Sequence, residues 1–139
     1  MGYTSFTSTT DAIVMGRTTF ETVLAFDIEW PYKKPVLVLS NTLKNTPEKL
    51  SGSVHLLKGT CKEILSEIHK KGHYKLYIDG GRTIQNLLKE GLIDEMIITT
   101  IPVVLGDGFP LFGKATKTID FECIESAIFL GKNCSKSFS

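Results

Sequence analysis

Apolar positions in the first half of the chain alternate between short runs and stripes with helical spacing. Runs of four to six residues between turn residues are typical of buried strands, whereas apolar residues three and four apart are typical of amphipathic helices. This pattern predicts strands over Asp11–Met15, Pro35–Ser40 and, more weakly, Ser53–Leu57. It also predicts a short helix over Thr18–Ala25 and a longer one from a Thr60 cap to Lys71.

The second half continues with one strand, one helix and a second strand. Tyr74–Ile78 is a predicted strand that runs into Asp79-Gly80-Gly81, and a helix follows with Ile84, Leu87 and Leu88 on one face and Gly91 as its stop. Met96–Val104 and Thr118–Ile128 are further predicted strands, whereas Ser126–Ser139 lacks the alternation expected of a closing strand.

Strands separated by crossover helices indicate an α/β fold whose sheet is parallel at least in its first part. The 139 residues show no repeat or linker, so we expect a single domain over residues 1–139. In open parallel sheets, ligands bind beyond the carboxyl ends of the strands.

Polar and glycine-rich turns follow four of these predicted strands. Gly16, Arg17 and Thr18 come after the first, and Ser40 and Asn41 after the second. Gly80, Gly81, Arg82 and Thr83 follow Asp79, and Gly106-Asp107-Gly108 ends the Met96–Val104 strand.

Two of these turns open helices, where glycine permits close approach of the backbone and the helix start attracts anions such as a pyrophosphate. Arginine adds a planar fork that suits phosphate. The alternative is that these are ordinary turns, since short polar turns end most strands. Neither turn matches the usual Rossmann or P-loop fingerprint.

Composition and charge argue against several classes of protein. A net charge of +1 without a basic stripe argues against nucleic acid as a partner. The apolar window Met96–Phe112 is interrupted by Pro102, Asp107 and Pro110, so we expect no membrane span. Three unpatterned cysteines and no signal peptide favour a cytoplasmic setting, and His69 and His73 have no further ligands that would make a metal site.

The segments IVMGRTTFETV, PVLVLS and YIDGGRTIQNLLKEGLIDEMIITTIPVVLGDGFPLF together resemble the dihydrofolate reductase-like superfamily. The similarity runs from residue 11 to about residue 125. It is most specific to the reductase domain of the bifunctional riboflavin-biosynthesis deaminase/reductase. The resemblance implies a three-layer α/β/α fold with a mostly parallel mixed sheet. It also implies an NADPH-dependent reductase that transfers hydride to a small-molecule substrate, a ribosylaminopyrimidine phosphate in the riboflavin branch.

The resemblance also implies roles for the strand-end residues. Gly16, Arg17 and Thr18 match the motif that holds the cofactor phosphates, with Arg17 near the 2′-phosphate of NADPH. Ser40 and Asn41 fall beside the adenosine half. Gly80, Gly81, Arg82 and Thr83 match the turn that holds the pyrophosphate. Asp79 matches an acidic position that faces the substrate in riboflavin-type reductases, although an aspartate here can also simply initiate the turn.

The ends of the chain depart from the family pattern. Only Met1–Thr10 precede Asp11, so the family's first strand is expected to be missing. In the family that strand lies between those matched here by Tyr74–Ile78 and Met96–Val104.

Three functions therefore remain open: an NADPH-dependent reductase, an NADP-binding relative with weak or lost turnover, and a dimerisation or interaction module. The resemblance also implies a homodimer.

Overall fold

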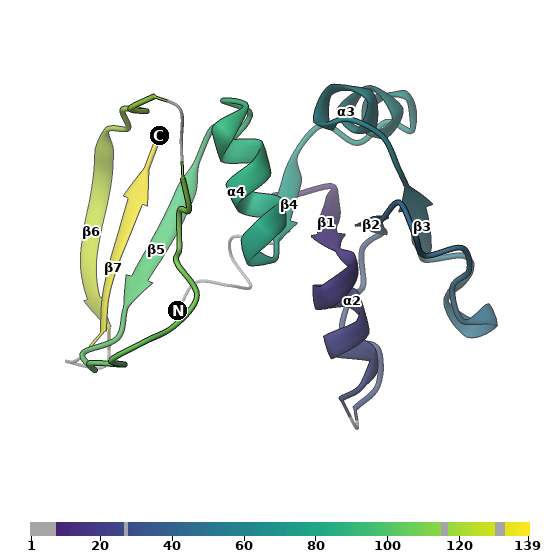
Figure 1. The fold of residues 1–139 in the computed structure, drawn as a ribbon, viewed down its shortest axis with the longest axis horizontal. Helices are drawn as coiled ribbons and strands as arrows, with labels where there is room; N and C mark the ends of the chain where they lie inside the picture. The colour runs from purple at the N-terminus through teal and green to yellow at the C-terminus, as the bar shows by residue number, and fades with distance from the viewer. Residues whose placement is uncertain (1–7, 27, 115–116, 130–132) are drawn as a thin grey trace. The chain divides into compact units, whose positions relative to one another are not determined.

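The computed structural model describes residues 8–26, 28–114, 117–129 and 133–139. Contacts within the chain divide it into two compact units, one from Gly2 to Asn86 and the other from Leu87 to Ser139 (Figure 1). The prediction of a single domain is not tested by this division, and the two units are described separately below.

A four-stranded parallel sheet forms the centre of the first unit. Its strands lie in the order β3-β2-β1-β4, so β1 and β2 occupy the middle. The bounds are Ala12–Gly16 for β1, Val36–Leu39 for β2, Val54–Leu57 for β3 and Leu76–Asp79 for β4. Residues Ala12–Met15 and Val36–Val38 are buried without interruption, as expected for parallel strands covered on both faces.

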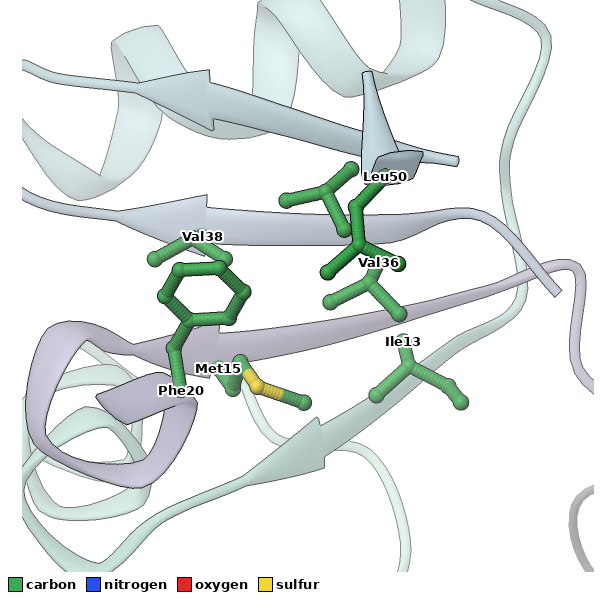
Figure 2. Packing of buried hydrophobic residues seen from close by; sticks show 7 residues of the cluster. Ile13, Met15, Phe20, Val36, Val38 and Leu50 are labelled. Atoms are coloured by element: carbon green, nitrogen blue, oxygen red, sulfur yellow. The ribbon is translucent and has the colours of Figure 1, made fainter. Parts of the chain in front are cut away.

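Helices cover both faces of this sheet. Successive strand residues point to opposite faces, so the continuous apolar runs of β1 and β2 present side chains on both. On one face, Ile13 and Met15 pack with Phe20 from α2 (Arg17–Leu24), and Val36, Val38 and Leu50 complete this cluster (Figure 2). On the other face, Ala12 and Val14 pack with Ile64 and Ile68 from α3 (Cys61–Lys70). The first unit is therefore a three-layer α/β/α arrangement.

The aromatic residues before β2 belong to the first of these clusters. Trp30 packs edge-on against Phe20, with ring centroids 5.9 Å apart, and against Tyr32 at 5.0 Å. Leu50 reaches the cluster from a short 3₁₀ helix, η1 (Glu48–Leu50). These contacts fix the connections before and after β2 against the sheet.

The amino ends of β1 and β4 are joined by a carboxylate. Asp11 Oδ2 accepts hydrogen bonds from the backbone N–H groups of Tyr74 at 2.9 Å and Lys75 at 3.0 Å. These bonds hold the pKa of Asp11 below its usual value. The opposite, carboxyl ends of the strands carry the polar turns singled out in the sequence.

Helix α4 (Gly81–Lys89) follows β4 and contains the boundary between the two units. Beyond it, β5 (Met96–Thr100), β6 (Cys123–Phe129) and β7 (Asn133–Phe138) form an antiparallel sheet in the order β5-β7-β6. Among the described residues, β4 and β5 belong to different sheets. The expected absence of the family's first strand concerns residues 1–10, of which 1–7 lie outside the described part of the chain, and it stays a prediction.

The interpretation of Ser126–Ser139 as lacking a closing strand was wrong. Residues Asn133–Phe138 form β7, the central strand of the second sheet. Its backbone pairs with β5 from Met96↔Phe138 to Thr100↔Cys134 and with β6 on its other side. Backbone pairing does not require apolar side chains, and neighbouring β6 residues Ile124 and Ile128 are themselves 59% and 72% exposed. A polar strand is therefore compatible with this sheet.

Most other predicted elements are confirmed to within a few residues, and the parallel first sheet is confirmed. Two boundaries differ more. The strand predicted over Met96–Val104 ends at Thr100, because Pro102 has no N–H and Val103 N–H bonds back to Ile101 O at 2.8 Å. The strand predicted from Thr118 begins at Cys123. In the part of the chain that is described, no helix has the length and apolar character needed to cross a bilayer.

Candidate functional site

Three neighbouring strands of the first sheet end in the predicted polar turns. The sheet order places β1 between β2 and β4, with Gly16 opposite Leu39 and Met15 opposite Asp79. Gly16 is the last residue of β1, Ser40 follows β2, and Gly80 follows β4. The parallel sheet thus gathers turns that are far apart in the sequence at one edge.

The turns after β1 and β4 approach each other closely. A Cβ placed on Gly16 would lie 2.8 Å from Thr83 Oγ1, in the first turn of α4. A Cβ placed on Gly80 would lie 2.6 Å from Thr19 Oγ1, in the first turn of α2, and 3.9 Å from Gly16 N. Each glycine therefore faces a threonine of the other turn. A side chain at either glycine would fill the space between the two helix starts.

The backbone at Gly80 has a second constraint. Its φ of +99° lies in the region that L side chains rarely adopt. The turn between β4 and α4 therefore requires glycine for its backbone conformation as well as for space.

The two helix starts at this edge carry no acidic residue, in contrast to α3. The first turns of α2 and α4 contain no Asp or Glu, and Gly16, the N-cap of α2, provides no side-chain cap. Helix α3 instead has a complete capping box formed by Thr60 and Glu63. An uncapped helix start without acidic residues, as at α2, is suited to an external anion, because its N–H groups and partial positive charge have no carboxylate partner in the first turn.

A second group of polar residues lies beside α2, at the end of β2. Arg17 Nη1 donates to Thr42 Oγ1 at 2.6 Å, and Arg17 Nε donates to Glu21 Oε1 at 2.8 Å. Ser40 Oγ accepts the N–H groups of Thr42 at 3.2 Å and Leu43 at 2.9 Å. These bonds fix the turn after β2 and hold the guanidinium of Arg17 next to it.

Asp79 is a half-buried carboxyl at the end of β4. Burial raises its pKa above the usual 3.8, and the N–H of Gly80 opposes that rise by hydrogen bonding to the carboxylate. The bond to Gly80 agrees with the turn-initiating role of this aspartate. Its predicted role in facing a substrate stays a prediction.

The structure brings together most of the predicted residues. Gly16, Gly80 and Thr83 form the close approach, while Arg17 and Ser40 share the second group through Thr42. Thr18, Asn41, Gly81 and Arg82 lie exposed at the same turns. Gly106-Asp107-Gly108 does not end a strand, because β5 stops at Thr100, and it belongs to the second unit.

The site residues predicted from the sequence did not include three residues that the structure places here, Thr19, Thr42 and Glu21. Thr19 and Thr42 each adjoin a predicted residue. The sequence therefore places their hydroxyl groups in the turns, but it does not indicate where those groups point. Glu21 lies four residues after Arg17 on α2, a spacing at which side chains of opposite charge meet. That spacing was the available signal.

Comparison of the chain with known protein families and solved structures identifies its family. The sequence profile of the family described as "RibD C-terminal domain" matches residues 4–129. The chain belongs to this RibD C-terminal domain family. The dihydrofolate reductase-like resemblance is thereby confirmed.

Individual similar proteins show how far the similarity reaches. The crystal structure of a "Putative riboflavin biosynthesis protein" from Shewanella sp. PV-4 superimposes with a TM-score of 0.95 and 45% identity, covering 99% of this chain and 78% of the other. "Uncharacterized protein YwjB" of Bacillus subtilis (strain 168) is 32% identical over 117 residues, covering 83% of this chain and 66% of YwjB. The chain thus spans slightly less than two thirds of that curated relative.

A more distant structure supports the fold alone. A diaminohydroxyphosphoribosylaminopyrimidine deaminase/5-amino-6-(5-phosphoribosylamino)uracil reductase from Thermotoga maritima has a TM-score of 0.71 at 10% identity. The superposition covers 98% of this chain and 47% of the Thermotoga chain. The predicted α/β reductase-type fold is confirmed by these matches.

Proposed function

We propose that this RibD C-terminal domain member binds NADPH at the carboxyl ends of β2, β1 and β4 and acts as a reductase of the riboflavin-biosynthesis type. Its substrate would be a small molecule such as a ribosylaminopyrimidine phosphate. The observation that carries the proposal is the close approach of Gly16 to Thr83 and of Gly80 to Thr19, which places two helix starts without acidic residues in their first turns side by side.

The residues at this edge fit the parts of a dinucleotide. The helix starts at Arg17 and Gly81, with backbone N–H groups and the hydroxyls of Thr19 and Thr83, suit a pyrophosphate. Arg17, held by Thr42, suits a 2′-phosphate through its remaining guanidinium donors.

Hydride chemistry is supplied by the nicotinamide when the cofactor is bound, so the protein needs mainly to bind, orient and exclude water. Arg17 and the two turns would anchor the phosphates. Asp79, at the end of β4, would accept hydrogen bonds from hydroxyl or amino groups of the substrate. The names of the family and of the Shewanella relative support riboflavin biosynthesis as the setting.

Cofactor titration tests the proposal. We expect NADPH to bind more tightly than NADH, because a charge-assisted contact is worth about 1.5–3 kcal/mol, or roughly tenfold to a hundredfold in affinity. Arg17→Ala should abolish this preference, with little effect on NADH. The comparison within the site is Arg82→Ala, which removes an exposed arginine from the helix start assigned to the pyrophosphate. It should weaken NADPH and NADH binding alike and leave the preference for NADPH in place. Equal affinities for the two cofactors in the parent protein would contradict the 2′-phosphate assignment.

NADPH oxidation with pyrimidine, pterin and nitro-aromatic substrates then separates a reductase from a binding protein without turnover. The second candidate is favoured if NADPH binds and no substrate in such a panel is reduced. Absence of any dinucleotide binding would contradict both.

A further inference from the structure

The guanidinium of Arg17 is held on two sides before any ligand arrives. Glu21 Oε1 accepts from Nε at 2.8 Å, and Thr42 Oγ1 accepts from Nη1 at 2.6 Å. Among the described residues, these two are the acceptors that contact the fork, and a guanidinium has five N–H donors. Arg17 is therefore oriented by the protein and retains donors for a further acceptor.

The two contacts differ in charge. Thr42 is neutral, whereas Glu21 places a carboxylate against the same cation that the proposed function assigns to the 2′-phosphate. Like charges on neighbouring groups repel, and a 2′-phosphate on Arg17 would lie within a few ångströms of Glu21. Glu21 therefore opposes the binding of an anion by the same arginine that it orients.

Stabilisation of the helix is a weak explanation for this pair. Both side chains are about half exposed, at 47% for Arg17 and 48% for Glu21, and an exposed pair four residues apart adds little to stability. The larger consequence is electrostatic, because the carboxylate partly neutralises the cation.

We propose that Glu21 sets the discrimination between 2′-phosphorylated and unphosphorylated dinucleotides by competing with the phosphate for Arg17. This inference rests on the proposed function and assigns a specificity-determining residue to the same site. The negative charge of Glu21 lowers the affinity for a 2′-phosphate. It has no comparable effect on a dinucleotide that carries only ribose hydroxyls there.

Glu21→Gln isolates the charge from the geometry. The amide oxygen of glutamine can still accept from Arg17 Nε, so the orientation of the fork is kept while the charge is removed. The matched control is Glu67→Gln on α3, because Glu67 also forms an exposed ion pair, with Lys70 at 3.5 Å. Circular dichroism checks that both variants are folded.

The experiment is calorimetric titration of the three proteins with NADPH, NADH and adenosine 2′,5′-bisphosphate at low and at raised salt. We expect Glu21→Gln to bind NADPH and the bisphosphate about threefold to tenfold more tightly at low salt, with the gain shrinking as salt screens the charges. NADH affinity should be unchanged, and Glu67→Gln should match the parent with all three ligands.

Other results would overturn it. If the parent prefers NADPH and Glu21→Gln shows the same or a lower NADPH affinity, the inference fails and the proposed function stands. An equal change for NADPH and NADH would assign Glu21 a purely structural role. If neither the parent nor Glu21→Gln binds any of the three ligands, the proposed function fails and this inference fails with it.

Discussion

At the sheet edge, Gly80 is constrained both by its backbone conformation and by the space around it. Gly80 has a positive φ, and a Cβ placed on it would lie 2.6 Å from Thr19 Oγ1. Gly72 has a similar φ of +87° but open space around it. The difference between these positions distinguishes a turn that also needs close approach from a turn that needs only an unusual backbone conformation.

Gly80→Ala should lower the free energy of unfolding by about 1–3 kcal/mol, because the new Cβ adds a contact with Thr19 to the strain of a positive φ. Gly72→Ala, which adds strain alone, should cost less, about 1 kcal/mol. Equilibrium unfolding in urea measures both. Equal losses in the two variants would mean that Thr19 does not crowd Gly80.

Asp79 makes stability depend on pH, because burial raises its folded-state pKa above the usual 3.8. A carboxyl with a raised folded pKa contributes stability that is fully present below the unfolded pKa and lost as pH rises through the folded pKa. Asparagine at position 79 cannot ionise. The free energy of unfolding of the Asp79→Asn variant, relative to that of the parent, should therefore rise as the pH increases from about 3 to 7.

Urea unfolding at both pH values measures this change. The matched control is Asp107→Asn, because Asp107 Oδ1 also accepts the next residue's N–H, at 2.7 Å, but is exposed. A stability difference between Asp79→Asn and the parent that is the same at both pH values would contradict the effect of burial.

Whole elements differ in how they begin, and this difference separates the site from the scaffold. Helix α3 closes its own start: Glu63 N–H donates to Thr60 Oγ1 at 3.2 Å, and Thr60 N–H donates to Glu63 Oε2 at 3.0 Å. Helix α2 leaves its start without a side-chain cap. The capped helix stabilises the scaffold, and the uncapped start is where we expect a ligand.

Thr60→Ala should destabilise the protein by about 1 kcal/mol through loss of the capping box, and Thr60→Ser should retain most of that stability. NADPH affinity should be unaffected by either change, since α3 lies outside the proposed site. Thermal unfolding and cofactor titration provide the two measurements. A loss of cofactor affinity in folded Thr60→Ala would place α3 in the site and contradict this separation.

At the scale of the whole molecule, the second unit exposes an apolar segment after β5. The large hydrophobic side chains from Ile101 to Phe112 are 48–98% exposed, with Val104 at 98% and Leu105 at 81%. Patches of this kind often mark interaction sites. We propose that a second copy of the chain covers this segment in the predicted homodimer.

We expect a concentration-dependent dimer in sedimentation, because covering apolar surface contributes about 25 cal/mol per Å² before the costs of association. Leu105→Glu should shift the equilibrium to monomer by placing a charge in the interface. Ile28→Glu is the matched control, since Ile28 is 63% exposed but lies in the first unit. A parent protein that is monomeric at high micromolar concentration would refute the homodimer.

Part of this molecule follows from the sequence because the determinants are local. The buried runs of β1 and β2, the apolar stripe of α3 and its Thr60 cap are encoded by neighbouring residues. Parallel pairing and the gathering of strand ends follow from general rules for crossover connections. The glycine turns and the residues that follow them resemble the family's motifs closely enough for the amino-acid sequence alone to indicate the family.

Tertiary structure decided what depends on residues far apart. The reciprocal approach of Gly16 to Thr83 and Gly80 to Thr19 requires β1 and β4 to be neighbours. The bond from Arg17 to Thr42 likewise requires β2 beside β1. Strand β7 was missed because its polar residues are placed by backbone pairing on both sides, which leaves no hydrophobic pattern in the sequence. Local chemistry thus determined the elements and their turns, whereas the direction of each side chain at the site depended on which strands lie next to each other.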